Sequence, residues 1–394
     1  MMLTLGTLLN ELERSVEPDE PVSYFMPTAH GPCRFGVYHG LHKIALERAG
    51  WGDRVSLIIP DDSDYYEGMS PEFAVKLWLG FVAHDLLEMM TLDVRPVERR
   101  KGAANALYRH YLAELVRCME RPPSDSALRI GLELVGGMWG TRRLLARAAK
   151  EYAEIKDGTK SVPTVALVGE IYVRLDPFAN DFIIQKLEQR GLRVRFAPFI
   201  EWMEYSNHVA LQRVLAGRGS SSDDPLTLNL TDLVQRVSLG TLYPICAQPL
   251  GWGPRLSVPE TVKAASPYVH PGLAGEAQLT VGGPLCEFEH GLVEGVVVVG
   301  PHECMPCKIA EAQYGLAAER TGIPYLTISV TGDPIDTEVV DRFAYDIRQA
   351  ALRRETTPRS SRLPVLQPGC SADTPCVHAA TCPAAGVTRP LAQA

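Results

Sequence analysis

Short apolar runs and stretches of helical apolar spacing alternate along the chain, which is the pattern of an α/β protein. The first unit is predicted to hold a short strand over Val22–Met26, an amphipathic helix that ends near Arg48, and a buried strand within 54–60. From Pro71 to about Ile155 the spacing is helical almost throughout. We interpret this stretch as a helical insertion.

A second α/β region follows, with its strands and helices again in alternation. Its predicted elements are a strand over Thr164–Val168, a helix over Pro177–Arg190, strands over Val194–Ala197, Gly295–Val299 and Pro324–Ser329, and a last helix over Ile335–Arg353. The remainder is rich in Pro, Ser, Thr and Ala and predicts disorder. The predicted domains are therefore 1–160, a first α/β lobe with the helical insertion; 161–354, a second α/β region; and 355–394, a disordered tail that contains cysteines.

A weak internal similarity supports two equivalent lobes. The segment HGPC at His30–Cys33 leads into a helix ending in ALERAG, and HECMPC at His302–Cys307 leads into one ending in LAAERTG. A hydrophobic strand follows each helix. Both cysteine segments should then lie at carboxyl ends of strands, where open α/β sheets bind their ligands.

Composition and charge narrow the classes of function. The 394 residues are 46% hydrophobic and 22% charged with a net charge of -8, so no basic excess is present to bind nucleic acid. The start of the chain lacks the features of an export signal, and no apolar run reaches the roughly twenty residues of a membrane span. We therefore expect a cytoplasmic protein without a membrane anchor. Nine cysteines in a reducing compartment indicate metal binding or catalysis.

Three cysteines are predicted to sit where a helix begins. Free backbone amides and a partial positive charge at that place lower the pKa of a thiol and suit ligation of an iron-sulfur cluster. Cys33, Cys304 and Cys307 occupy such positions. CMPC at 304–307 is also the pattern of a redox dithiol. Cys286 is a candidate fourth ligand, with a small buried core residue as the alternative.

The other cysteines carry weaker signals. Cys118 and Cys246 fall in helical or apolar stretches and are interpreted as buried structural residues. Cys370, Cys376 and Cys382 in the tail could bind a metal or a second cluster, but their wide, even spacing matches no standard ligand pattern.

Three further residues are candidates for acid/base work. His30 and His302 precede the cysteines at matching places, where they could donate hydrogen bonds to sulfur or carry protons; simple turn histidines are the alternative. Glu170 follows a predicted strand and could serve as an acid or base, with helix capping as the alternative.

An ordered series of blocks resembles the cluster-binding region of acyl-CoA dehydratase activase-related proteins, a group similar to the subunits of 2-hydroxyacyl-CoA dehydratase and benzoyl-CoA reductase. The similarity extends over about residues 20–354. The blocks are HGPCRFGVYH at 30–39, GEIYVRLDPFAND at 169–181, FIEWMEY at 199–205, PGLAGEAQLTVG at 271–282 and ECMPCKIAEA at 303–312.

The resemblance implies two flavodoxin-like (Rossmann-like) lobes with an oxygen-sensitive [4Fe-4S] or double-cubane cluster in the interlobe cleft. Cys33 matches the CRFG cysteine of the family and Cys304 its CMP cysteine, whereas Cys307 departs from the common pattern. In such systems a separate ATPase with its own cluster injects a low-potential electron, which drives reduction or dehydration of an acyl-CoA thioester. This chain shows no ATPase motif, so a partner ATPase is implied.

Three hypotheses follow from these observations. The first is an electron-transfer or reductase component, with Cys33, Cys304 and Cys307 holding the cluster and Glu170 and the two histidines around it. The second is a non-catalytic module that carries a cluster or zinc for assembly or regulation. The third is a thiol-disulfide oxidoreductase that uses the CMPC pair. A homodimer is compatible with all three.

Overall fold

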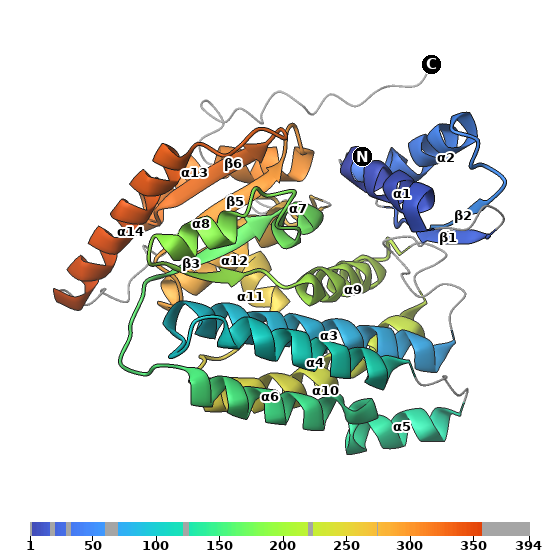
Figure 1. Cartoon of the computed structure of the whole chain (residues 1–394), viewed down its shortest axis with the longest axis horizontal. Coiled ribbons are helices and arrows are strands. Elements are labelled where there is room, and N and C mark those ends of the chain that lie inside the picture. Colours follow the sequence, from blue (N-terminus) through green and yellow to red (C-terminus); the bar gives the residue numbers. More distant parts are fainter. Residues whose placement is uncertain are drawn as a thin grey trace. The chain divides into compact units, whose positions relative to one another are not determined.

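The loops that carry the predicted site are positioned by a four-stranded parallel sheet in the order β4-β3-β5-β6. Figure 1 labels β3, β5 and β6 of this sheet. The strands are β3 (Thr164–Gly169), β4 (Arg193–Phe196), β5 (Gly295–Pro301) and β6 (Tyr325–Val330). Strands β3 and β5, TVALVG and GVVVVGP, are almost continuous apolar runs, as expected for parallel strands that are covered on both faces. The predicted α/β class is confirmed: the fold is mixed α/β, mostly helical, with two small parallel sheets.

The computed structural model describes residues 2–15, 20–28, 33–59, 70–120, 126–219, 224–273 and 275–356. His30 and the tail with Cys370, Cys376 and Cys382 lie outside the described residues. Met1–Pro358 cluster into one compact unit.

Alternate residues of the central strands point to opposite faces of the sheet. Val165, Leu167, Val297 and Val299 pack on one face against helices α7 (Ile171–Leu175), α8 (Ile183–Gln189) and α14 (Thr337–Thr356). The neighbouring strand residues pack on the other face against α12 (Ala277–Glu289) and α13 (Met305–Thr321), with α11 (Val258–Ala265) packed on α12. The result is a three-layer sandwich of helices, sheet and helices.

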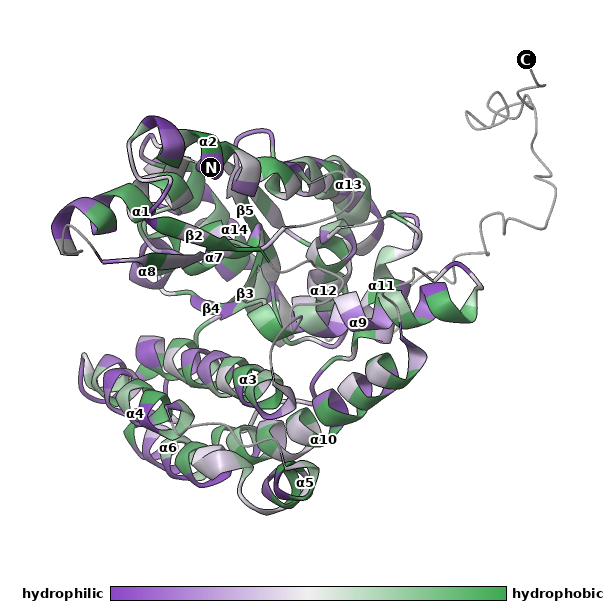
Figure 2. Cartoon of the chain, turned by 90° about the vertical axis from the view of Figure 1, so that its right-hand side faces the viewer, coloured by the Kyte–Doolittle hydropathy of each residue, from purple (hydrophilic) through white to green (hydrophobic). Residues whose placement is uncertain are grey.

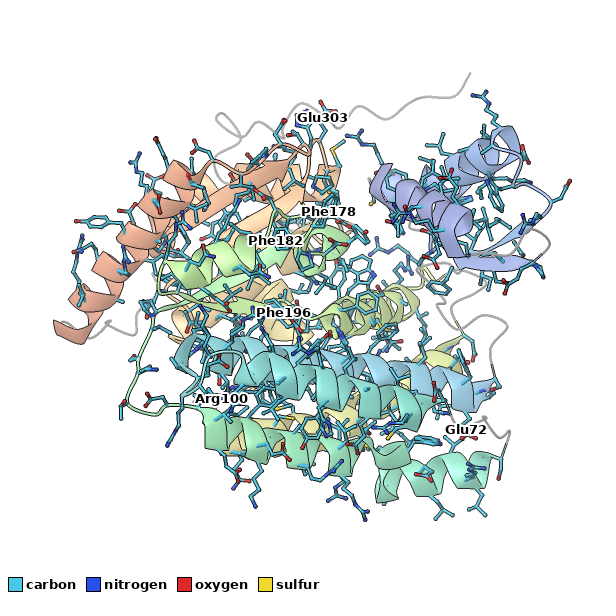
Figure 3. All side chains as sticks on the ribbon, viewed as in Figure 1. Glu72, Arg100, Phe178, Phe182, Phe196 and Glu303 are labelled. Carbon is cyan, nitrogen blue, oxygen red and sulfur yellow. The ribbon has the colours of Figure 1, made fainter. Side chains whose placement is uncertain are left out.

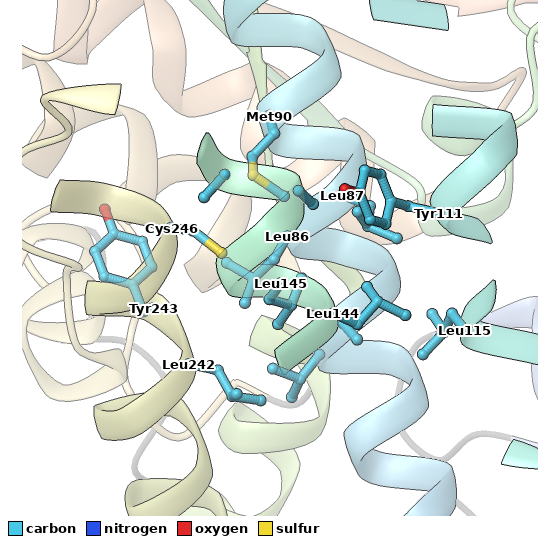
Figure 4. Close-up of a cluster of buried hydrophobic side chains, with 14 of the residues drawn as sticks. Leu86, Leu87, Met90, Tyr111, Leu115, Leu144, Leu145, Leu242, Tyr243 and Cys246 are labelled. Atoms are coloured by element: carbon cyan, nitrogen blue, oxygen red, sulfur yellow. The ribbon is translucent and has the colours of Figure 1, made fainter. Parts of the chain in front are cut away.

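A layer of long helices forms the largest hydrophobic core (Figure 4). It is built from α3 (Pro71–Val94), α4 (Ala103–Met119), α5 (Ala127–Gly136), α6 (Thr141–Ile155), α9 (Phe199–Leu215) and α10 (Pro225–Leu250), with 3-10 turns at Arg95–Val97 and Met138–Gly140. Polar and apolar residues alternate along α4 and α6 in Figure 2, as expected for amphipathic helices. Helix α10 packs on α3 and α6, so this layer combines the predicted insertion with a later part of the chain.

The N-terminal unit has the predicted order of strand, helix and strand. Strand β1 (Val22–Phe25) pairs in parallel with β2 (Val55–Ile58), and α1 (Met2–Ser15) and α2 (Tyr38–Arg48) supply Leu8, Leu12 and Leu46 to its small core. The loop after β1 leads to Cys33 and then to a short 3-10 helix over Arg34–Val37.

One predicted helix is wrong in its extent. Only the shorter α8 lies within the region predicted as Pro177–Arg190, and a separate helix, α7, ends before Pro177. Proline disfavours helical geometry at the preceding residue, and Asp181 and Phe182 then adopt positive φ angles of 50° and 57°. The side chain of Asn180 accepts a hydrogen bond from the N–H of Ile183 at 3.2 Å, and a new helix begins there.

None of the helices in the described ranges combines the length and apolar character needed to cross a lipid bilayer.

Candidate cysteine site

The candidate site lies where two neighbouring strands send the chain in opposite directions. Strand β3 leads to β4 on one side of the sheet, whereas β5 leads to β6 on the other. The carboxyl ends of two such strands leave a crevice between their loops, the usual ligand position in open α/β sheets. Glu170 follows β3, and the loop with Cys304 follows β5.

Glycine lets the two loops approach closely. Gly169 has a φ of 116°, and a Cβ there would lie 1.9 Å from the carbonyl oxygen of Val299. A Cβ on Gly300 would lie 2.6 Å from Sγ of Cys307. The sulfur of Cys307 therefore packs directly on the end of β5, in a space that a side chain at residue 300 would fill.

Cys304 and Cys307 form the start of α13. Cys304 is the N-cap, with φ of -64° and ψ of 115°, and Pro306 stands in the first turn, where its missing N–H costs nothing. The thiol of Cys307 donates a hydrogen bond that lowers the pKa of Cys304, against the effect of burial. The same hydrogen bond raises the pKa of Cys307, because ionising it would place a second negative charge beside the first. The pair therefore favours one shared proton and a thiolate at Cys304.

Cys33 is the N-cap of the short 3-10 helix, with φ of -84° and ψ of 124°. Burial raises its pKa to about 11, an N–H donated by Phe35 lowers it, and the negative charges of Cys304, Glu276 and Glu170 raise it further. The structure thus brings Cys33 within electrostatic range of Cys304.

A contact between residues 269 positions apart joins the two cysteine loops. A guanidinium nitrogen of Arg34 donates to the backbone carbonyl of Glu303 and lies 3.4 Å from its carboxylate. Glu303 (Figure 3) has a φ of 57°, an uncommon value for a residue with a side chain. Because both side chains are largely exposed, the ion pair itself contributes little stability, but its geometry aligns the residues next to Cys33 and Cys304.

Two carboxyl groups at the starts of helices lie within electrostatic range of the cysteines. Glu170 caps α7: its carboxylate accepts the N–H groups of Tyr172 at 3.2 Å and Val173 at 2.8 Å. Burial nevertheless raises its pKa. Glu276, at the start of α12, is only 8% exposed, and burial followed by repulsion from Glu170 raises its pKa to about 8. The site therefore holds a carboxyl that keeps its proton at neutral pH.

Arg174 is the buried cation of this region. It is 5% exposed and donates to the carbonyl oxygens of Gly169 at 2.9 Å and Pro198 at 3.3 Å. Its charge lowers the pKa of both Glu170 and Glu276. Its Nε is buried without a hydrogen-bond partner in the described part of the chain, so this N–H of the guanidinium is a free donor.

The remaining predicted residues are not drawn together in this way. His302 is exposed, with 64% of its side-chain surface accessible, and its Nε2 lies 3.8 Å from Oε1 of Glu303. Cys286 lies ten residues beyond Glu276, which corresponds to about 15 Å along a helix. Its sulfur is 3.8 Å from Nδ1 of His290, and burial raises its pKa to about 11. Cys246 is fully buried in the helical core.

The donor set suits soft metal chemistry, since thiolates are the ligands of iron-sulfur clusters and of zinc. In the described ranges, no group of three or more His, Cys, Asp or Glu residues is arranged to hold a metal ion. A single tetrahedral ion needs its ligand atoms within about 4 Å of one another, because metal-sulfur bonds are about 2.3 Å long. A cluster of several irons spaces its thiolates more widely than a single ion does.

Glu276 and Arg174 were not recognised in the sequence as site residues. Both stand inside blocks that carry the family resemblance, and Glu276 is the one charged residue of its block, PGLAGEAQLTVG. An acidic residue in such a stretch signals a buried charge, which requires a functional or structural partner.

Comparisons of the chain with protein-family models, with curated proteins and with solved structures found no significant match.

Proposed function

We propose that the protein is an iron-sulfur component of the reductase or dehydratase type, related to the acyl-CoA dehydratase activase-related group. Cys33, Cys304 and Cys307 hold the cluster, between two flavodoxin-like lobes. A separate ATP-dependent activator with its own cluster reduces the protein, and the substrate is an acyl-CoA thioester or a related small molecule. The cluster, when bound, supplies low-potential electron transfer.

One observation carries this proposal: Arg34, next to Cys33, donates a hydrogen bond to the backbone carbonyl of Glu303, next to Cys304, so two loops about 270 residues apart meet beside their cysteines. Each loop presents its cysteine as the N-cap of a helix, where backbone N–H groups offset the negative charge of a thiolate.

The surrounding residues suit a site at which charge is transferred. Gly300 leaves space for the sulfur of Cys307, and Arg34 fixes the loop that carries Cys304. Glu276 keeps a proton on its carboxyl at neutral pH and can supply it to a neighbouring group. Glu170 receives two backbone N–H groups and is held in one orientation.

A second function, thiol-disulfide exchange, is favoured by the hydrogen bond between Cys304 and Cys307. A lowered pKa at the first cysteine of a CxxC pair, with the second cysteine buried behind it, is the arrangement of an attacking and a resolving thiol. This function requires only the pair, and Cys33 takes no part in it.

The two functions are separated by purifying the protein without oxygen and replacing Cys33 with Ser. The proposed function predicts a brown protein with bound iron and sulfide and a large loss of both in Cys33→Ser. Cys118→Ser, which changes a cysteine in the helical layer, is the matched control and keeps its colour. A colourless wild-type protein whose dithiol reactivity is the same in Cys33→Ser supports thiol-disulfide exchange instead.

A further inference from the structure

Helix α10 carries a row of exposed apolar side chains along the face opposite the helical core (Figure 1). The row consists of four residues whose exposed fractions run from 39 to 68%: Leu226, Leu230, Leu233 and Val237. They follow one another at intervals of four, three and four, which keeps them on one side of a helix. Single exposed leucines are common, but an apolar row of this kind marks an interaction surface.

The same face continues into a groove. The next two positions in this alternation of four and three residues are Gly240 and Pro244, and both are exposed. Both line a groove of about 530 Å³, together with Trp252 and Pro254 from the segment that follows the helix. One face of α10 therefore has large side chains in its first half and a hollow in its second half.

This face holds no unpaired charge. Of the 26 residues of α10, only Asp232 and Arg236 are charged, and they form an ion pair with each other at 2.5 Å. Arg255, the other charged residue of the groove, donates two hydrogen bonds to Glu204. Another protein surface can therefore cover the face without burying an uncompensated charge. With a single basic residue, the helix lacks the cluster of Lys and Arg that binds a lipid surface.

We propose that this face of α10 binds the same face of a second copy of the chain, with the two helices antiparallel. The intervals along the face, four, three, four, three and four, read the same in both directions. A two-fold axis beside residue 235 therefore matches every position of the face with another position of the same face. It places three pairs opposite each other: Leu226 and the partner subunit's Pro244, Leu230 and the partner's Gly240, and Leu233 and the partner's Val237.

The pairing sets large residues against small ones, as in the knobs-into-holes packing of coiled coils. A Cβ added at Gly240 would meet no atom within 4 Å apart from the backbone of its own helix, so the isolated chain has room for a larger residue there. Glycine weakens a helix interior and serves where another group must approach the backbone closely. In the proposed dimer, the partner subunit's Leu230 occupies this room.

The size of the surface indicates a reversible dimer. A helix of 26 residues is about 39 Å long and about 12 Å wide, so its face covers about 470 Å² on each copy. Two such faces bury about 900 Å², and the walls of the groove at Trp252 and Pro254 bring the total near the 1,000 Å² or so of a weak specific interface. We therefore expect dissociation in the micromolar range.

The test is sedimentation equilibrium of the full chain over a wide range of concentrations. The wild type should show a reversible equilibrium between monomer and dimer. Leu230→Glu and Gly240→Lys, each at an exposed position, should each raise the dissociation constant at least tenfold. Leu352→Glu, which makes the first of these changes at a leucine of α14 that is 57% exposed, is the matched control and should dimerise as the wild type does.

The double variant Leu230→Glu with Gly240→Lys tests the register. The two positions are ten residues apart, about 15 Å along one helix, so the new charges cannot meet within one chain. In the antiparallel dimer each introduced carboxylate faces an introduced ammonium of the other copy. We expect the double variant to dimerise at least tenfold more tightly than either single variant.

Three results would overturn the proposal. The first is a wild type that stays monomeric at all concentrations, which would leave this face to a different protein. The second is an unchanged dissociation constant in Leu230→Glu and Gly240→Lys, with circular dichroism showing that both are folded. The third is a double variant that dimerises no better than the single variants, which would exclude the antiparallel register.

Discussion

Replacing Glu201 with Gln should stabilise the protein at alkaline pH and change little in acid. The substitution removes an ionisable group but keeps its size. In the folded chain, burial raises the pKa of Glu201 from its ordinary value of 4.5 to about 7. At about 1.4 kcal/mol per pH unit, this difference corresponds to about 3 kcal/mol.

The sign follows from proton binding. Between pH 4.5 and 7 the folded state holds a proton that the unfolded state has released, so the contribution of Glu201 to stability is fully present below pH 4.5 and is lost as the pH rises through 7. At pH 8 the wild type carries a partly buried carboxylate, whereas Glu201→Gln carries a neutral amide. We expect the variant to be more stable by up to about 3 kcal/mol at pH 8 and nearly equal to the wild type at pH 4.5.

The assay is urea unfolding followed by tryptophan fluorescence at both pH values, with Glu319→Gln as the exposed control. Equal slopes of unfolding free energy against urea would show that the surface exposed on unfolding is unchanged. A loss of stability in Glu201→Gln of the same size at both pH values would refute the reasoning, since it would mean that the carboxyl makes favourable contacts which the amide cannot replace.

Three further changes test the packing and the thiols. Gly300→Ala places a Cβ against the sulfur of Cys307 and should cost about 1 to 3 kcal/mol in urea unfolding; an unchanged midpoint would contradict the close packing. In metal-free reduced protein, iodoacetamide at pH 7.5 should modify Cys304 before Cys307, and mass spectrometry of the peptides that shows the reverse order would exclude the proposed thiolate. Ser238→Ala removes the acceptor for the indole N–H of Trp78, at 2.8 Å, and should destabilise by about 1 to 3 kcal/mol; a neutral effect would show that the indole finds another partner.

The sheet was the most predictable part of the fold. Strands β3, β5 and β6 follow directly from short apolar runs rich in valine and isoleucine, and the structure places each within about two residues of its predicted limits. The signal is strong here because both faces of the sheet are covered, so few polar residues interrupt the pattern.

The partners of the long helices could not be predicted in the same way. Helical spacing shows that 71–155 is helical, but it does not show that α10, about 70 residues further on, packs on α3 and α6. Helix α3 is buried around much of its circumference, so its pattern does not single out one face for one neighbour.

The residues of the candidate site were also predictable only in part. Cys304 and Cys307 could be placed at a helix start from local sequence, because the strand, the turn and Pro306 fix the N-terminus of α13. The pKa of Glu276 depends on burial by distant segments, and no local pattern gives that burial. Arg174 was missed for the same reason.

The central claim is that Cys33 and the CMPC pair hold one iron-sulfur cluster. The most direct measurement is the iron and acid-labile sulfide content of protein purified without oxygen, compared between the wild type and Cys33→Ser. The account predicts that the wild type contains both elements and that the variant loses most of each while keeping its circular dichroism. Zinc without sulfide in the wild type, or full retention of iron and sulfide in the variant, would contradict it.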